Sequence, residues 1–118
     1  VGDSLHMHLR TELEANNVLY ASHAKCIYDF NRESSVHSKI KNAPNTSKAR
    51  YITEDVPYLF VPFCELADLC GVDVPIAKAL VTIASYYNDE NYMKTGRTLA
   101  KMGFNHWTKQ EILEFLEA

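Results

Sequence analysis

Hydrophobic residues recur at helical spacing in the first third of the chain. Leu5, Leu9 and Leu13 are four residues apart, which predicts a helix whose amino end Ser4 can cap. Two asparagines at residues 16–17 then interrupt the pattern. A second apolar series predicts another helical stretch after them, and it comprises Val18, Leu19, Cys26, Ile27 and Phe30.

The middle of the chain begins with a polar loop. Residues 41–50 are polar and form the best internal boundary, whereas residues 55–70 are apolar at helical spacing. Pro57 suits the first turn of this predicted helix, where its missing N–H is not needed. Pro62 lies inside the pattern and should kink or split the helix, and Gly71 is a natural left-handed stop.

The last third also follows helical patterns. An apolar series predicts a helix over residues 73–87, which the polar segment 88–91 breaks. Two short turns then end at glycines, and Thr108 with Glu111 three residues later is a capping-box pattern that opens a last helix. No stretch alternates at period two for long enough to predict a strand, so we predict an all-α domain.

Composition excludes several classes of protein. A length of 118 residues fits one domain, and 47% hydrophobic with 23% charged residues is typical of a folded protein. The net charge of −3 does not favour nucleic-acid binding, and no apolar run approaches the roughly 20 residues that span a membrane. We predict a cytoplasmic protein, because no signal-peptide pattern opens the chain and Cys26, Cys64 and Cys70 in apolar contexts suit buried, reduced thiols.

The densest polar cluster is R-Y-I-T-E-D at residues 50–55, directly ahead of the predicted helix. A helix amino end offers free N–H groups and partial positive charge. Arg50 adds a planar guanidinium that suits a carboxylate or a phosphate, and Thr53, Glu54 and Asp55 add oxygens that can cap the helix. Two interpretations stay open from these residues alone: a binding site, or an ordinary helix cap beside a surface arginine.

Three stretches resemble the carboxy-terminal helical domain of the opine (octopine/nopaline) dehydrogenases. They are RYITEDVP at 50–57, VPFCELADLCGVDVP at 61–75 and GRTLAKMGF at 96–104, and the resemblance extends over about residues 43–104. It implies an all-α helical bundle of the 6-phosphogluconate-dehydrogenase C-terminal-like kind. We therefore expect residues 1–118 to be a single helical domain or a fragment of one.

The resemblance also implies an activity. Opine dehydrogenases reductively condense an amino acid with a 2-keto acid such as pyruvate, using NADH or NADPH, in a cleft between a Rossmann domain and the helical domain. It assigns Arg50 to a substrate carboxylate and Asp55 to the orientation of a catalytic histidine. Glu54 and Thr53 complete the candidate substrate-binding set, although we expect them to cap the helix rather than to touch substrate.

Several features depart from the family pattern. The chain has four glycines and no glycine-rich phosphate-binding turn, so we expect NAD or NADP to be bound mainly by a Rossmann domain missing from this chain. The family's catalytic histidine lies well upstream and has no match here, because His37 is 18 residues before Asp55 and lacks its context. Leu59 stands where the family usually has glycine. We expect the chain alone to be inactive.

We predict no metal site. His6 and His8 are two residues apart, which places them on different sides of a helix, and the spacing of Cys64 and Cys70 is not that of a zinc site. His23 and His106 are each expected to serve at the surface or in a cap.

Two alternative functions stay open. One is the helical domain of a ketopantoate-reductase or hydroxyacid-dehydrogenase type enzyme, in which a lysine would act as the acid. The other is a non-catalytic helical interaction module whose apolar stretch 56–70 binds a partner. For the opine reading, the partners are the amino acid, the keto acid and the missing Rossmann domain, without nucleic acid or membrane. We expect self-association, as in a homo-oligomer, if the chain is made alone, because a fragment exposes apolar surface.

Overall fold

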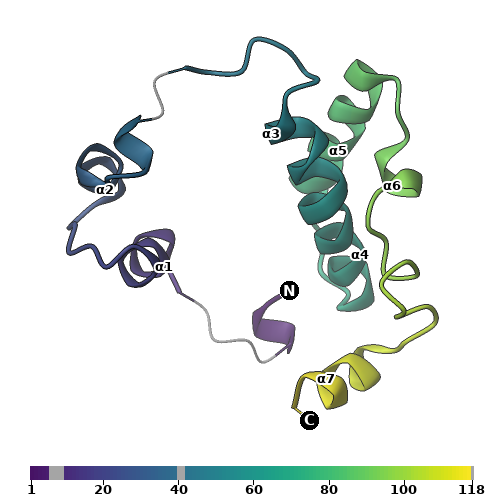
Figure 1. The fold of residues 1–118 in the computed structure, drawn as a ribbon. Coiled ribbons are helices and arrows are strands. Elements are labelled where there is room, and N and C mark those ends of the chain that lie inside the picture. The colour runs from purple at the N-terminus through teal and green to yellow at the C-terminus, as the bar shows by residue number, and fades with distance from the viewer. Residues whose placement is uncertain (6–9, 40–41, 118) are drawn as a thin grey trace. The chain divides into compact units, whose positions relative to one another are not determined.

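The computed structural model describes residues 1–5, 10–39 and 42–117 and divides the chain into two compact units, His8–Ala43 and Val1–Met7 with Pro44–Ala118. Within the described ranges the chain forms helices and turns without a strand (Figure 1). The prediction of an all-α fold is therefore confirmed. In these same ranges no helix has the length and apolar character needed to cross a membrane.

The unit His8–Ala43 contains helices α1 (Glu12–Leu19) and α2 (Ile27–Glu33), followed by the 3₁₀ turn η2 (His37–Lys39). A capping box opens α1, because the Thr11 hydroxyl accepts the backbone N–H of Glu14, and the Glu14 carboxylate accepts that of Thr11. The box fixes the start of the helix at Thr11.

The predicted interruption at residues 16–17 is wrong, because α1 runs through both asparagines to Leu19. An asparagine inside a helix costs only about 0.7 kcal/mol. Asn17 also finds a partner, since its amide donates to the carbonyl of Ala24 over 2.9 Å. The chain turns instead at Ala21, which has a positive φ of 50°.

The start of the predicted amino-terminal helix is described only in part. Ser4 lies within the 3₁₀ turn η1 (Asp3–Leu5). Leu9, His6 and His8 lie outside the described residues, so the pattern that includes them is not tested.

The other unit is built on a helical hairpin. Its elements besides η1 are α3 (Arg50–Thr53), the π-helix η3 (Val56–Phe60), α4 (Val61–Leu69), α5 (Pro75–Asn88), α6 (Tyr92–Thr95) and α7 (Lys109–Glu117). Helices α4 and α5 lie side by side (Figure 1), and the chain reverses between them at Gly71, whose φ of +69° confirms the predicted left-handed stop.

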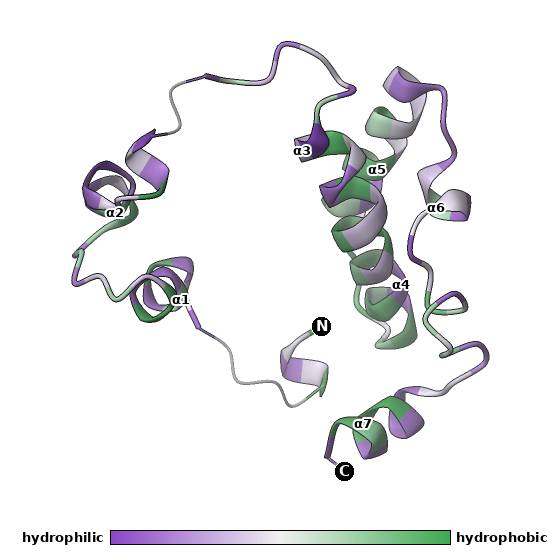
Figure 2. Ribbon diagram, in the orientation of Figure 1, coloured by the Kyte–Doolittle hydropathy of each residue, from purple (hydrophilic) through white to green (hydrophobic). Residues whose placement is uncertain are grey.

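The core of this unit lies between η3, α4, α5 and α6. Along the helical run from α3 to α4, hydrophobic and hydrophilic segments alternate in Figure 2. Partly buried Ile52, Phe60 and Val74 pack against the buried cluster, which consists of Val56, Val61, Cys64, Ala77, Val81, Ala84 and Tyr92. Burying this apolar surface is the main force that holds α3, η3 and α4 in one continuous helical run.

Pro62 neither splits nor ends this run. The chain widens into a π-helix instead, in which the Val61 N–H bonds to the Val56 carbonyl five residues earlier. In this register the carbonyl of Pro57 faces Pro62, which has no N–H. The Pro57 carbonyl accepts the backbone N–H of Arg97 instead, over 2.8 Å. The predicted break at Pro62 therefore does not occur. The helix changes its hydrogen-bond register there instead, and the spacing of the two prolines favours this change.

The segment after α6 packs on this π-helix. Gly96 is buried against it, and the Arg97 guanidinium lies 5.3 Å from the centre of the Tyr58 ring. One turn further along α4, the carboxylate of Glu65 accepts the backbone N–H of Leu99. The glycine-rich stretch 96–104 therefore has a structural role in holding the helical run.

The three cysteines differ in exposure. Cys64 is fully buried in the core, and this burial raises the pKa of its thiol. Cys70 is half-buried, whereas Cys26 is exposed at the start of α2, where its thiol donates to Asp29 over 3.1 Å. The prediction of buried thiols is therefore confirmed for Cys64 and wrong for Cys26, because a residue at a helix cap lies outside the apolar face.

Candidate functional site

The polar cluster at residues 50–55 lies inside the helical run and not at its amino end. Helix α3 begins at Arg50, five residues earlier than expected, with Ala49 in the N-cap position. Neither Ala49 nor Asp55 makes a side-chain capping hydrogen bond. The prediction that Thr53 and Glu54 cap the amino end of a helix is thus wrong, because Thr53 is the last residue of α3 and Glu54 directly follows it.

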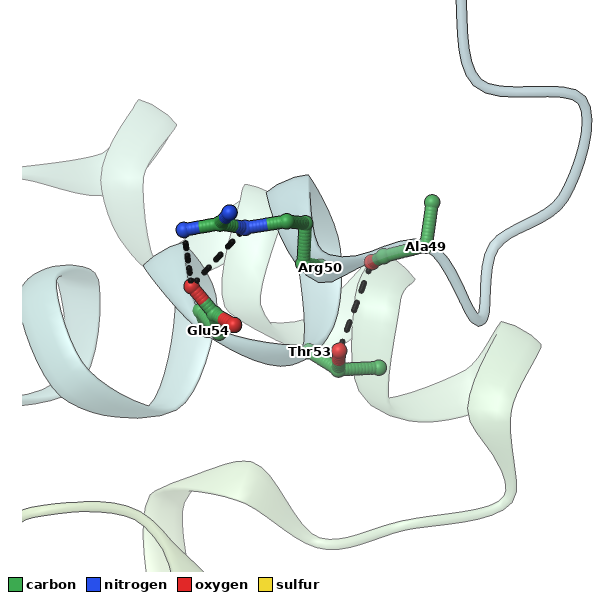
Figure 3. A network of polar contacts seen from close by, with 4 residues as sticks. All are labelled: Ala49, Arg50, Thr53 and Glu54. Atoms are coloured by element: carbon green, nitrogen blue, oxygen red, sulfur yellow. Dashed lines mark hydrogen bonds and ion pairs between the residues drawn. The ribbon is translucent and has the colours of Figure 1, made fainter.

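Arg50 and Glu54 form an ion pair along the helix surface (Figure 3). The Nε and one terminal nitrogen of Arg50 lie 3.2 Å and 3.0 Å from the same carboxylate oxygen of Glu54. The Arg50 side chain is 76% exposed and that of Glu54 53% exposed. Such a pair contributes only about 0.3–0.5 kcal/mol, and the guanidinium keeps further N–H donors for a ligand.

Arg50 and Asp55 line one exposed hollow. Residues four apart lie on the same side of a helix, which aligns Arg50 with Glu54 and Tyr51 with Asp55. All four side chains are exposed and line a shared hollow of about 290 Å³. Among the residues that the structure describes, the Asp55 carboxylate has no hydrogen-bond or ion-pair partner. The hollow is therefore lined by a guanidinium that pairs with Glu54 and by the carboxylate of Asp55.

Thr53 lies apart from this face. It is half-buried, and its hydroxyl donates to the carbonyl of Ala49 over 3.4 Å (Figure 3). It lines a different hollow together with Lys48, Asn88 and Tyr92. The structure thus brings together Arg50, Glu54 and Asp55 from the predicted set and separates Thr53 from them.

Of the described histidines, His37 has local partners. His37 belongs to the unit His8–Ala43, where its Nδ1 lies 3.0 Å from the Ser34 hydroxyl and its ring packs edge-on against Tyr20 at 4.9 Å. His106 sits in a turn with a positive φ of 67°. No group of three metal-ligating side chains occurs in the part of the chain that the structure describes.

Sequence reasoning missed a buried polar link behind the site. Asn88 was expected only to help end a helix, yet it is 5% exposed and its amide donates to the carbonyl of Ser47 and to the hydroxyl of Tyr92, over 2.9 Å each. Ser47 and Asn88 are 41 residues apart. No local pattern could signal a contact over that separation.

The residues of this chain do not fit a dinucleotide. A Rossmann site needs a parallel sheet and a glycine-rich turn that leads into a helix. The described ranges contain no strand, and Gly71, Gly96 and Gly103 each stand alone in a turn. The described residues therefore form no Rossmann-type dinucleotide site.

Comparison with known proteins gives a family. The domain described as "NAD/NADP octopine/nopaline dehydrogenase, alpha-helical domain" matches residues 1–88. This match includes the residues before 43, where no motif was apparent in the sequence.

Individual relatives agree with it. The chain is 33% identical over 100 residues to "Protein ocs" of Agrobacterium vitis, across 85% of this chain and 28% of that protein. It is 36% identical over 73 residues to "Vitopine synthase" of Allorhizobium ampelinum, across 62% of this chain and 20% of that protein. It is 34% identical over 74 residues to "Opine dehydrogenase" of an Arthrobacter species, across 63% of this chain and 21% of that protein. The chain therefore spans less than a third of the length of these relatives.

Proposed function

The chain belongs to the octopine/nopaline dehydrogenase family, as part of its α-helical domain, and we propose that it is the substrate-binding part of an NAD(P)-dependent opine dehydrogenase. In the proposed reaction, the amino group of an amino acid condenses with the carbonyl of a pyruvate-like 2-keto acid, with loss of water. NAD(P)H supplies the hydride that reduces the product to a secondary amine. The names of two relatives, an opine dehydrogenase and a vitopine synthase, support this chemistry.

The observation that carries the proposal is that the exposed side chains of Arg50 and Asp55 line a shared hollow. The Arg50 guanidinium is planar and permanently charged, so its free donors can bind the carboxylate of the keto acid. Glu54 holds the guanidinium from one side through its two short contacts. This pairing reduces the freedom that Arg50 would lose on binding substrate.

Asp55 is proposed to orient a histidine supplied by another part of the enzyme. Its carboxylate is exposed and unpaired among the described residues, so it is available to accept an imidazole N–H. An aspartate in this role fixes the tautomer of the ring and stabilises its protonated form. The histidine can then move a proton at the substrate oxygen or nitrogen. Thr53 supports the helix from the other side and does not touch substrate.

The cofactor is proposed to lie in a Rossmann domain outside these residues, since nothing in the described part of the chain fits a dinucleotide. We also propose a cytoplasmic location, because the three cysteines form no disulfide in this structure and free thiols persist in reducing compartments.

The Arg50 assignment is tested by replacing Arg50 with Met or Lys in the complete enzyme. A charge-assisted hydrogen bond contributes about 1.5–3 kcal/mol, so the KM of the keto acid should rise by roughly ten- to a hundredfold for Met. Lysine should recover part of this loss, because it keeps the charge without the planar fork. The KM of the cofactor should change less than about twofold. An equal effect on both KM values would exclude a role for Arg50 in binding the keto-acid carboxylate.

The Asp55 assignment is tested by Asp55→Asn, which keeps the size of the side chain and removes its charge. Loss of an oriented general acid or base lowers kcat by on the order of a hundredfold. Asp68→Asn is the matched control, because Asp68 is also exposed on the same helical run but pairs with Lys78 over 2.6 Å. Wild-type turnover by Asp55→Asn would show that the orienting role is wrong.

A further inference from the structure

Asn88 links two segments that are distant in the sequence. It is the last residue of α5, and its side-chain nitrogen donates to the Ser47 carbonyl and to the Tyr92 hydroxyl. The ammonium of Lys48 donates in turn to the Asn88 backbone carbonyl over 2.8 Å. The stretch at residues 47–48 is therefore bound to the end of α5 by two hydrogen bonds in opposite directions.

This link lies directly ahead of Arg50. Helix α3 is a single turn without a side-chain cap, and a helix this short is not stable by itself. Its position depends on what anchors it at each end. Partly buried Ile52 packs on the core. The hydrogen bond from Asn88 to the Ser47 carbonyl holds the chain three residues before Arg50.

We propose that Asn88 is a positioning residue for substrate binding: it fixes the 47–48 segment, and through it the start of α3 and the guanidinium of Arg50. This inference rests on the proposed function, in which Arg50 binds the keto-acid carboxylate. Displacing an oriented group by even 1 Å can lower the rate by about two orders of magnitude, so a fixed α3 matters for binding.

The chemistry of the side chain supports a role for its amide donors. Both N–H groups of the Asn88 amide are used, whereas its oxygen is buried without a partner among the described residues. Leucine would fill a similar volume and remove the unpaired oxygen, but it would leave the Ser47 carbonyl and the Tyr92 hydroxyl without this donor. The stabilising value of an asparagine at this position therefore lies in the bonds that it donates to Ser47 and Tyr92.

The test uses the complete enzyme and four substitutions, one of which is also combined with two of the others. Asn88→Leu removes both side-chain bonds, and Lys48→Met removes the hydrogen bond that the exposed Lys48 side chain donates to the Asn88 carbonyl. Ala84→Gly is the control, since it loosens the same helix at a buried position one turn earlier. The fourth substitution is Arg50→Met. It is made alone, and it is also combined with Asn88→Leu and with Lys48→Met in two double variants.

We expect Asn88→Leu to raise the KM of the keto acid by about tenfold and Lys48→Met by about threefold, with the KM of the cofactor unchanged within about twofold. Neither change should raise the keto-acid KM further in the Arg50→Met background, because groups that act through Arg50 are not additive with its loss. Ala84→Gly should lower the melting temperature without moving this KM.

The outcomes distinguish the positioning role of Asn88 from the proposed function of Arg50, on which it rests. If Arg50→Met raises the keto-acid KM while Asn88→Leu and Lys48→Met do not, the positioning role is wrong and the proposed function stands. The positioning role is also wrong if Ala84→Gly raises the KM as much, or if the Asn88 and Arg50 effects add. If Arg50→Met leaves the KM unchanged, the carboxylate site itself is wrong and the inference is lost with it.

Discussion

Replacing Gly96 with alanine should test the packing that holds the helical run. An added Cβ would lie 2.7 Å from the Pro57 carbonyl oxygen, 2.7 Å from that of Tyr92 and 3.0 Å from a methyl of Val61. Ordinary contacts of carbon with a carbonyl oxygen are about 3.3 Å or longer, so the backbone must shift. The φ of −65° at Gly96 suits any residue, and the cost is therefore steric.

The magnitude follows from what this shift disturbs. Moving Gly96 away from the π-helix weakens the hydrogen bond from the Arg97 N–H to the buried Pro57 carbonyl. Loss of such a bond to a buried acceptor costs about 1–3 kcal/mol. Overpacking adds about 1 kcal/mol or more, while alanine recovers about 0.4–1 kcal/mol by restricting the unfolded chain. We expect the free energy of unfolding to fall by about 2 kcal/mol in urea denaturation followed by circular dichroism.

Gly71 provides the matched control. Its φ is +69° and an added Cβ would meet nothing within 4 Å, so a substitution there strains only the backbone. Asparagine tolerates this conformation, and Gly71→Asn should change the stability by less than about 0.5 kcal/mol. Asparagine at position 96 should be at least as destabilising as alanine. A Gly96→Ala protein as stable as the wild type would refute the close approach to Pro57.

Two further predictions concern titratable groups. The Thr108 N–H, and then its hydroxyl, bond to Glu111 and lower the pKa of that carboxyl below its ordinary value of 4.5. This contribution to the stability of α7 is present above pH 4.5 and is lost as the pH falls through the lowered pKa, so the chemical shifts of α7 should titrate there and Glu111→Gln should remove that titration. For the thiols, Cys26 should react with iodoacetamide long before Cys64, because Cys64 is buried and burial raises its pKa. Equal labelling rates would contradict the core assignment of Cys64.

The helical class and several boundaries could be predicted from local patterns. Gly71 and the Thr108–Glu111 box act as the sequence indicates, because a positive φ and a capping box are short-range features. The start of α3 could not be predicted, since Ala49 supplies no cap and the turn is held by burial of Ile52 in the tertiary structure. The π-helix could not be predicted either. The Pro57 carbonyl that it leaves open accepts the N–H of Arg97, 40 residues further along the chain, and only the folded structure shows this contact.

The geometry of the candidate site could not be predicted from the sequence. The motif at residues 50–55 makes Arg50 and Asp55 candidates, and in the structure both line one exposed hollow. Thr53 belongs to the same motif and yet faces another hollow, because a helix distributes neighbouring residues around its axis. The support from Asn88 depends on a contact over 41 residues, which only the folded structure reveals.

The most direct test of the account follows NADH and NADPH absorbance with the complete enzyme, pyruvate and a panel of amino acids added one at a time. The account predicts that the coenzyme is consumed only when a keto acid and an amino acid are both present. Consumption with the keto acid alone would contradict it and would indicate a hydroxyacid-dehydrogenase type of reaction.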